Sequence, residues 1–152
     1  MMTDIFYWPE ATFFPLLSTL TALPLLTAFA VLLCRSRAFY GWAFVGAIAN
    51  MLLSLYLLRV FDSEAPGIHL AESLDLPGLS YRVGVDGTNI LFVPLASIIG
   101  LLALVYSTIT RHRKDKLFFA CLLAYQGILI GAFVALNTLQ FWLWCLLELV
   151  PV

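Results

Sequence analysis

Long apolar segments separated by short polar ones dominate the chain. Four of them, residues 11–34, 39–60, 89–110 and 117–136, have the length of membrane spans, and a fifth runs over residues 139–152. A transmembrane helix needs about 20 mostly apolar residues, and the fifth segment would rise only about 21 Å through a hydrocarbon core of about 30 Å. The pattern predicts an all-α integral membrane protein with four full transmembrane helices and a truncated fifth. The chain is then either a fragment of a longer protein or a short subunit that another chain completes.

The longest polar interval, residues 61–88, has a different pattern. Apolar residues alternate on both sides of Pro77-Gly78, although Glu72 interrupts the first row. The alternating apolar positions are Ile68, Leu70, Leu74 and Leu76 before the turn, and Leu79, Tyr81, Val83 and Val85 after it. Period two on both sides of a Pro-Gly turn is typical of a β-hairpin. An isolated hairpin is marginally stable, so we expect this one to lie on the membrane surface or against a neighbouring subunit.

Basic residues indicate the orientation. The loops after the first and third predicted spans hold six of the eight Lys and Arg residues: Arg35, Arg37, Arg111, Arg113, Lys114 and Lys116. Cytoplasmic loops carry such an excess, so we expect these two loops inside, and the N-terminus and the hairpin loop outside.

Composition narrows the class of protein further. Hydrophobic residues make up 62% of the chain and charged residues 11%, whereas a soluble domain is nearer half apolar and a quarter charged. The net charge of -1 provides no basic stripe for phosphates, so nucleic acid is not an expected partner. The acidic first ten residues lack the basic region of a cleavable signal peptide.

Glu148 is the only acidic residue deep in a predicted span, and it is the main candidate for chemistry. A carboxylate inside a membrane is costly and suggests a function, and burial can raise its pKa as a proton relay requires. Alternatively, Glu148 lies near an interface, where it is solvated or pairs with a partner. Pro151 would kink a helix that continued past it.

Asn50 and Gln126 are polar residues in the middle of predicted spans. Hydrogen bonds between helices are the favoured interpretation, and a polar transport path is the alternative. The chain contains no nucleotide-binding, metal or nucleophile motif, so we expect no catalysis by this chain alone and no bound cofactor.

Two segments resemble a known family. Residues 81–93 read YRVGVDGTNILFV and lead into the third span, with Asp86 and Gly87 as the structural motif. Residues 131–137 read GAFVALN, and an aromatic run then leads to ELVPV at the end. Together they resemble the N-terminal third of the antiporter-like subunits of complex I, of the NuoM and NdhD type.

The resemblance has implications for function. It implies a membrane subunit of a complex I-like, proton-translocating oxidoreductase, with quinone, iron–sulfur clusters and NADH or ferredoxin bound elsewhere in the complex. Other membrane subunits and lipid would be its partners, in a bacterial inner membrane or a thylakoid-type membrane. The family's proton-handling glutamate aligns with Leu146, which implies that this chain mainly supports the proton path rather than forming it.

Two other functions fit the same residues. The chain could belong to a proton-coupled inorganic-carbon or cation transport complex, since such systems reuse antiporter-like modules. It could also be a structural assembly subunit.

Overall fold

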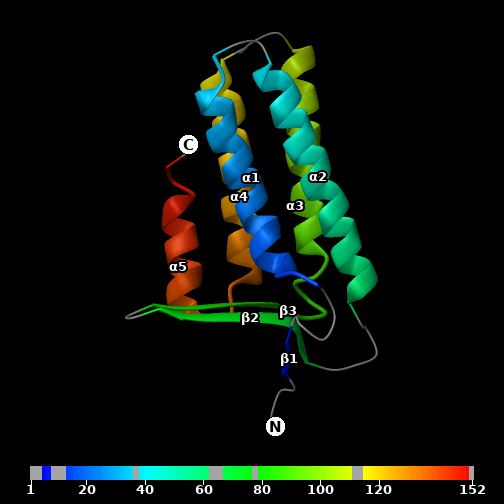
Figure 1. Ribbon diagram of the computed structural model, residues 1–152, viewed down its shortest axis with the longest axis vertical. Helices are drawn as coiled ribbons and strands as arrows, with labels where there is room; N and C mark the ends of the chain where they lie inside the picture. The colour runs from blue at the N-terminus through cyan, green and yellow to red at the C-terminus, as the bar shows by residue number, and fades with distance from the viewer. Residues whose placement is uncertain are drawn as a thin grey trace.

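The computed structural model describes residues 5–7, 13–35, 38–61, 67–76, 79–110 and 115–150. Figure 1 shows a bundle of helices with a small sheet across one end. The elements in chain order are β1 (Ile5–Tyr7), α1 (Leu16–Leu33), α2 (Phe39–Val60), β2 (Ile68–Leu76), β3 (Leu79–Val85), α3 (Phe92–Ile109), α4 (Lys116–Val134) and α5 (Thr138–Leu147).

Within the described residues, four helices, α1 to α4, are long and apolar enough to cross a membrane. The helix α2 has the predicted bounds. The helix α1 begins five residues and α3 three residues inside the predicted span, and each ends one residue inside it. The helix α4 begins one residue before its predicted span and ends two residues inside it. Pro15 precedes α1 and lacks an N–H group, which makes it a natural boundary. Before α3, the Asp86 carboxylate organises a turn that delays the helix until Phe92.

The fifth apolar segment forms a helix of 10 residues, shorter than the predicted range. A helix of this length rises about 15 Å, half of a hydrocarbon core. The helix ends at Leu147, and Glu148 to Val150 form a turn. In this turn Leu149 N–H donates to the Leu146 carbonyl and Val150 N–H donates to the Leu147 carbonyl. A proline at position 151 also disfavours helical backbone at Val150.

The helices pack as a bundle in which α4 is central. The helix α1 packs on α2 and α4, α3 packs on the same two helices, and α5 packs on α4 (Figure 1). Small residues allow the closest approaches. A Cβ atom at Gly46 on α2 would lie 2.4 Å from the Thr27 side chain, and one at Gly131 on α4 would lie 2.6 Å from the Trp144 ring on α5. Such small-residue contacts are typical of membrane helices.

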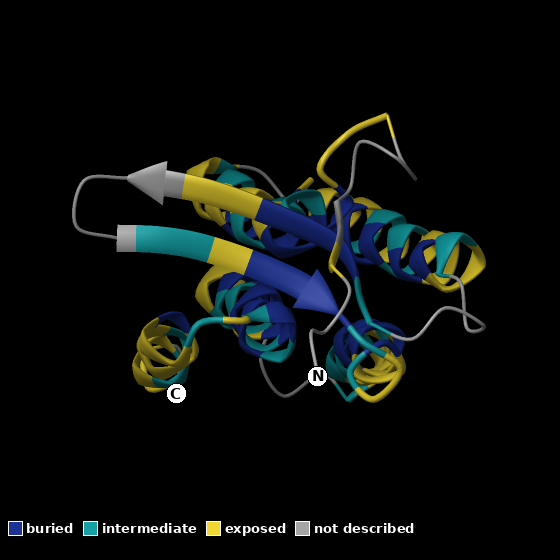
Figure 2. Ribbon diagram, turned by 90° about the horizontal axis from the view of Figure 1, so that it is seen from below, coloured by how far each residue is buried: buried dark blue, intermediate teal, exposed yellow. Residues whose placement is uncertain are grey.

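The predicted hairpin is present as the antiparallel pair β2–β3, although the turn at 77–78 lies outside the described residues. A strand that the sequence pattern did not predict, β1, pairs in parallel with β2 and completes a sheet of order β1-β2-β3. Figure 2, seen from below, shows β2 and β3 crossing the end of the bundle, with their inner parts buried. Leu70 has a φ of 55°, at a bulge between His69 and Glu72.

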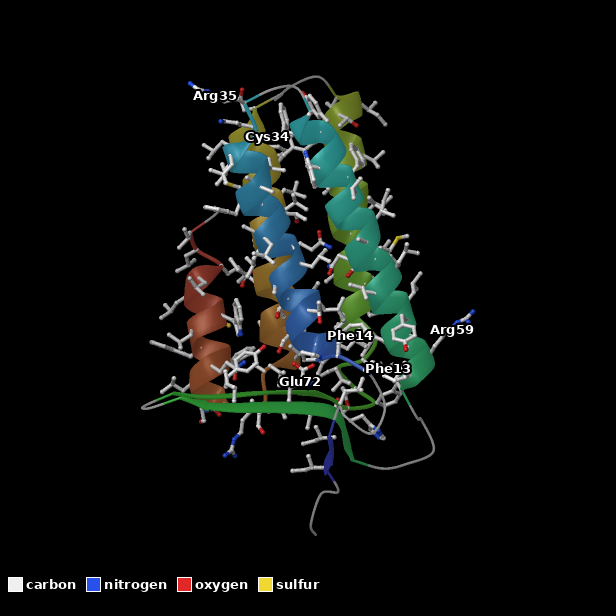
Figure 3. All side chains as sticks on the ribbon, in the orientation of Figure 1. Phe13, Phe14, Cys34, Arg35, Arg59 and Glu72 are labelled. Atoms are coloured by element: carbon white, nitrogen blue, oxygen red, sulfur yellow. The ribbon has the colours of Figure 1, made fainter. Side chains whose placement is uncertain are left out.

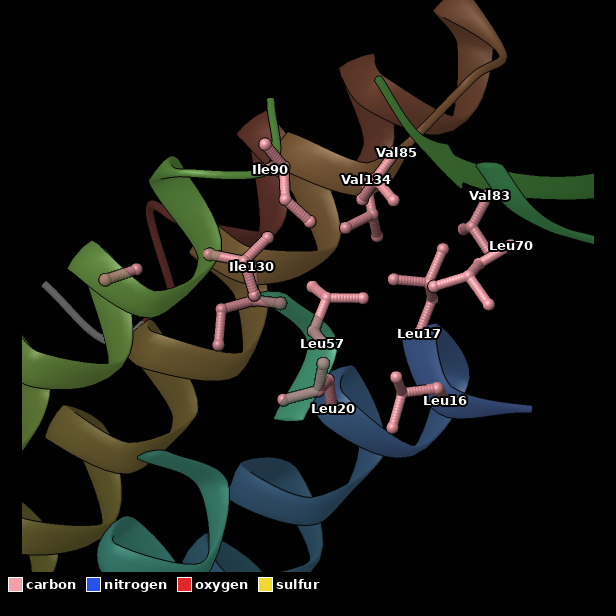
Figure 4. Close-up of a cluster of buried hydrophobic side chains, with 12 residues drawn as sticks. Leu16, Leu17, Leu20, Leu57, Leu70, Val83, Val85, Ile90, Ile130 and Val134 are labelled. Atoms are coloured by element: carbon pink, nitrogen blue, oxygen red, sulfur yellow. The ribbon is translucent and has the colours of Figure 1, made fainter. Parts of the chain in front are cut away.

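Two apolar clusters form the core. The first joins the hairpin to the adjoining helix ends (Figure 4), and the second lies toward the other end of the bundle. The first cluster contains Leu16, Leu17, Leu20, Leu57, Leu70, Val83, Val85, Ile90, Val93, Ala96, Ile130 and Val134. The second contains Ala28, Val31, Phe39, Ala43, Ala47, Leu104, Phe119, Ala120 and Leu123.

Candidate functional site

Glu72 of β2 supplies the cap that the start of α1 lacks. The first amides of a helix have no partner within the helix, and Pro15, the N-cap residue, makes no side-chain cap bond. The Glu72 carboxylate accepts hydrogen bonds from Leu17 N–H at 2.7 Å and from Ser18 N–H at 3.0 Å. Figure 3 shows Glu72 beside this end of α1, with Arg35 at the opposite end of the bundle. A carboxylate also interacts favourably with the positive end of the helix dipole.

The carboxylate is deeply enclosed but well bonded. Glu72 is 5% exposed, and the Ser18 hydroxyl donates a further hydrogen bond to it. The Tyr81 hydroxyl of β3 lies 3.1 Å from the same Ser18 hydroxyl. Burial raises the pKa of Glu72 above its usual value of 4.5, although the three hydrogen bonds to the carboxylate oppose this shift.

The hairpin is bonded at its other side to the connection between α4 and α5. Leu136 N–H donates to the Arg82 carbonyl at 3.0 Å, and Arg82 N–H donates to Gln140 Oε1 at 2.9 Å. Asn137 caps α5 by accepting from Leu139 N–H, and its amide donates to the Ser80 hydroxyl at 3.2 Å. The hairpin therefore links the start of α1 to the start of α5, two elements far apart in the sequence.

Glu148, the predicted proton-path candidate, is the C-cap residue of α5 and is half-buried. The Tyr125 hydroxyl of α4 donates a hydrogen bond to Glu148 Oε1 at 2.7 Å. Leu146, two residues earlier, is 46% exposed on the surface of α5. The carboxylate thus faces α4, and a phenol holds it there.

Asp86 and Gly87 lie in the turn that leads into α3. Asp86 Oδ1 accepts from Thr88 N–H at 2.9 Å and from Asn89 N–H at 2.8 Å. Gly87 is exposed, and a Cβ atom there would have no neighbour within 4 Å, so space does not require glycine. Pro151 lies outside the described residues.

Asn50 and Gln126 are both buried inside the bundle. Asn50 Nδ2 donates to the Ser97 hydroxyl of α3 at 3.4 Å. The side-chain amide of Gln126 has no hydrogen-bond partner among the residues that the structure describes. It lies against α3, because a Cβ atom at Gly100 would be 2.5 Å from Gln126 Oε1.

Sequence reasoning missed the roles of Glu72 and Tyr125. Glu72 did leave a signal, as the one charge in an otherwise apolar row of the hairpin. Tyr125 left none, because a tyrosine in an apolar span is unremarkable until its partner is known. In the part of the chain that the structure covers, no group of three or more His, Cys, Asp or Glu residues could hold a metal ion.

No protein-family profile matches the chain. Similar curated proteins include NADH-quinone oxidoreductase subunit M of Rickettsia felis, 33% identical over 90% of this chain and 30% of its own length. NAD(P)H-quinone oxidoreductase chain 4 1 of a Synechococcus strain is 35% identical over 91% of this chain and 27% of its own length. F(420)H(2) dehydrogenase subunit M of Methanosarcina mazei is 29% identical over 90% of this chain and 28% of its own length. The chain therefore spans about 30% of the length of the curated relatives that it matches.

Two solved structures share the fold. One is respiratory complex I from Thermus thermophilus with bound NADH, with a TM-score of 0.74, 24% identity and coverage of 89% of this chain and 27% of the matched chain. The other is the membrane-bound sulfane sulfur reductase, an archaeal respiratory membrane complex, with a TM-score of 0.77, 17% identity and coverage of 90% and 22%.

The apolar helices and the shared fold define an integral membrane protein. More particularly, the chain is a homologue of the subunit M and chain 4 proteins of complex I-like quinone oxidoreductases. The family resemblance expected from residues 81–93 and from the C-terminal segment is thereby confirmed.

We predict that Glu72→Ala loosens the start of α1. The change leaves Leu17 N–H and Ser18 N–H without their acceptor in a buried place, which costs about 1–3 kcal/mol. Hydrogen exchange in the first turn of α1 should become about tenfold faster or more. Ser73→Ala, at the exposed neighbouring position, is the matched control and should leave exchange unchanged. Equal protection in Glu72→Ala would contradict the capping role.

The raised pKa of Glu72 makes the stability contributed by its contact with α1 depend on pH. A carboxyl whose pKa is higher in the folded state binds protons more readily there, so stability rises as the pH falls from above the folded pKa toward the usual value of 4.5. Glu72→Gln removes this titration. The thermal midpoint of the wild-type assembly, relative to that of Glu72→Gln, should therefore rise as the pH is lowered. A difference that shrinks on acidification would refute the predicted sign.

Proposed function

We propose that the chain forms part of an antiporter-like membrane subunit in a proton-translocating oxidoreductase of the complex I type. The observation that carries the proposal is its similarity to subunit M and chain 4 proteins over about nine tenths of its length. The membrane-length helices and the fold shared with complex I support it. The relatives include oxidoreductases and a dehydrogenase with different named electron donors, so the donor stays open.

The chain mainly packs against neighbouring helices and supports the proton path, and it does not form a complete proton channel by itself. Within the described helices α1 to α4, the only Lys and Arg residues are Arg59, in the last turn of α2, and Lys116, the first residue of α4, so neither lies deep in a span. The position that the resemblance assigns to the family's proton-handling glutamate is Leu146. Quinone, iron–sulfur clusters and NADH or ferredoxin would be bound by other subunits of the complex.

Glu148 would adjust the proton path locally. Its contact with Tyr125 joins α5 to α4, at a surface where a neighbouring subunit or lipid could approach Leu146 and Leu147. A carboxylate can act there by its charge or by its hydrogen bond, and two substitutions separate these effects. Glu148→Gln removes the charge but keeps an acceptor for Tyr125, whereas Tyr125→Phe removes the hydroxyl donor and keeps the charge.

We predict that Glu148→Gln lowers proton pumping only in part, by less than about fivefold. An interhelical hydrogen bond in a membrane contributes about 1 kcal/mol, so even complete loss of the contact with Tyr125 would alter a rate only about fivefold, and glutamine keeps an acceptor for that contact. Pumping is measured in reconstituted vesicles and normalised to the amount of assembled complex. Tyr106→Phe, at an exposed tyrosine of α3, is the control for Tyr125→Phe.

Each result decides between roles. Reduced pumping in Glu148→Gln with normal pumping in Tyr125→Phe assigns the effect to the charge of Glu148. Reduced pumping in Tyr125→Phe with normal pumping in Glu148→Gln assigns the effect to the hydrogen bond. Complete loss of pumping in Glu148→Gln with normal assembly would make Glu148 an essential relay and would refute the supporting role.

We further propose that the hairpin faces the outside and that the Arg35 end of the bundle faces the cytoplasm. Figure 3 shows Arg35 at the end of the bundle away from the hairpin. Lys116, the first residue of α4, lies at the same end, because its Nζ donates to the Leu32 carbonyl near the end of α1 at 3.1 Å. The support is the excess of Lys and Arg in the sequence between α1 and α2 and between α3 and the start of α4, since only Arg59 and Arg82 of the eight lie elsewhere.

Cysteine labelling tests the orientation. Two variants are made from a chain in which Cys34, Cys121 and Cys145 are replaced by alanine. One variant carries a single cysteine at position 36 and the other carries a single cysteine at position 73. An impermeant reagent added to intact cells should label position 73, which is exposed on β2, and should spare position 36. Labelling at position 36 from outside would reverse the proposed topology.

A further inference from the structure

A layer of buried polar side chains divides the two apolar clusters of the bundle. Every one of the four long helices contributes to it, at the height where the first cluster ends and the second begins. The members are Thr21 of α1, Asn50 and Ser54 of α2, Ser97 of α3 and Gln126 of α4, each 4% exposed or less. A polar layer enclosed by apolar residues in a membrane bundle needs internal partners, because lipid offers none.

The hydroxyl groups of this layer find their partners within their own helices. Thr21 donates to the Ser18 carbonyl at 2.9 Å, Ser54 to the Met51 carbonyl at 2.7 Å, and Ser97 to the Val93 carbonyl at 3.1 Å. These three groups are therefore satisfied without any additional molecule.

The two amides are not satisfied in this way. Asn50 Nδ2 reaches Ser97 only at 3.4 Å, which is a long bond. Asn50 Oδ1 and both polar atoms of Gln126 have no partner anywhere in the described ranges. A buried amide without hydrogen bonds destabilises the folded state, so native proteins rarely contain one.

Both amides lie against the same turn of α3. Asn50 bonds to Ser97, and the Gln126 amide lies beside Gly100, three residues later in the helix. The missing side chain at Gly100 leaves room for the Gln126 headgroup, since a Cβ atom there would lie 2.5 Å from Oε1. The unsatisfied donors and acceptors of α2 and α4 are thus gathered on one turn of a third helix.

We infer that this layer binds internal water, with at least one molecule bridging Asn50 Oδ1 and the Gln126 amide beside Ser97 and Gly100. Water suits the site because it can donate and accept, and buried water typically bonds to about three polar groups. A cation is disfavoured, because none of the layer's side chains carries a charge to compensate it. For the same reason the layer cannot store a proton, and its role differs from that proposed for Glu148.

The direct test is a high-resolution cryo-electron microscopy map of the whole assembly that contains the full-length chain. We expect a solvent peak at about 2.7–3.2 Å from Asn50 Oδ1 and from a Gln126 side-chain atom. A direct bond between the two amides, ordered amides with no peak between them, or a peak with metal-like coordination by several oxygens would each overturn the inference.

Substitution gives a second and independent test. Gln126→Met keeps the length of the side chain but removes its polar atoms, and Leu123→Met, at the fully buried position three residues earlier, is the matched control. If water bridges the amides, Gln126→Met abolishes the peak and lowers the thermal midpoint of the assembly more than Leu123→Met does. If the amides are dry and unsatisfied, Gln126→Met raises the midpoint, and the inference fails.

Discussion

The contact between Glu72 and the first turn of α1 determines how the sheet and the bundle fit together. The first amides of α1 have no partner within the helix, its N-cap residue Pro15 makes no side-chain cap bond, and here a distant strand provides the acceptor. The carboxylate is buried at the same place, so the contact is effective only if the hairpin is held in register against the helices. Val83, which pairs with Glu72 across the hairpin, is fully buried in the first apolar cluster and fixes that register. The bonds from β3 to the connection between α4 and α5 then extend the same arrangement to the far side of the bundle.

The same requirement, that every buried polar group has a partner, explains the interior of the bundle. Hydroxyl groups in the helices bond to carbonyls one turn back, which lets Thr21, Ser54 and Ser97 be buried without distorting the fold. Asn50 and Gln126 are longer and have two kinds of polar atom, so their own helices cannot satisfy them. Their position places a polar layer between the two apolar clusters of the bundle.

Hydropathy predicted the helices well, because the length and composition of a membrane span are local properties of the sequence. Alternation predicted the hairpin for the same reason. It did not predict β1, which has only three residues and depends on pairing with β2. It also could not show that Glu72 faces α1, because the bulge at Leu70 changes the phase of the strand. The contact between Tyr125 and Glu148 was equally out of reach, since it depends on the packing of α5 against α4, which Gly131 permits by its small size.

We propose that the chain is part of a membrane subunit of a redox-driven complex, and its neighbours in the membrane are the strictest test of that proposal. Mass spectrometry of the complex purified through the tagged full-length chain, from native membranes in a mild detergent, identifies those neighbours directly. We predict other antiporter-like membrane subunits together with subunits that carry iron–sulfur clusters. A complex without any redox subunit, and with a soluble zinc protein in its place, would contradict the account and favour a transport complex.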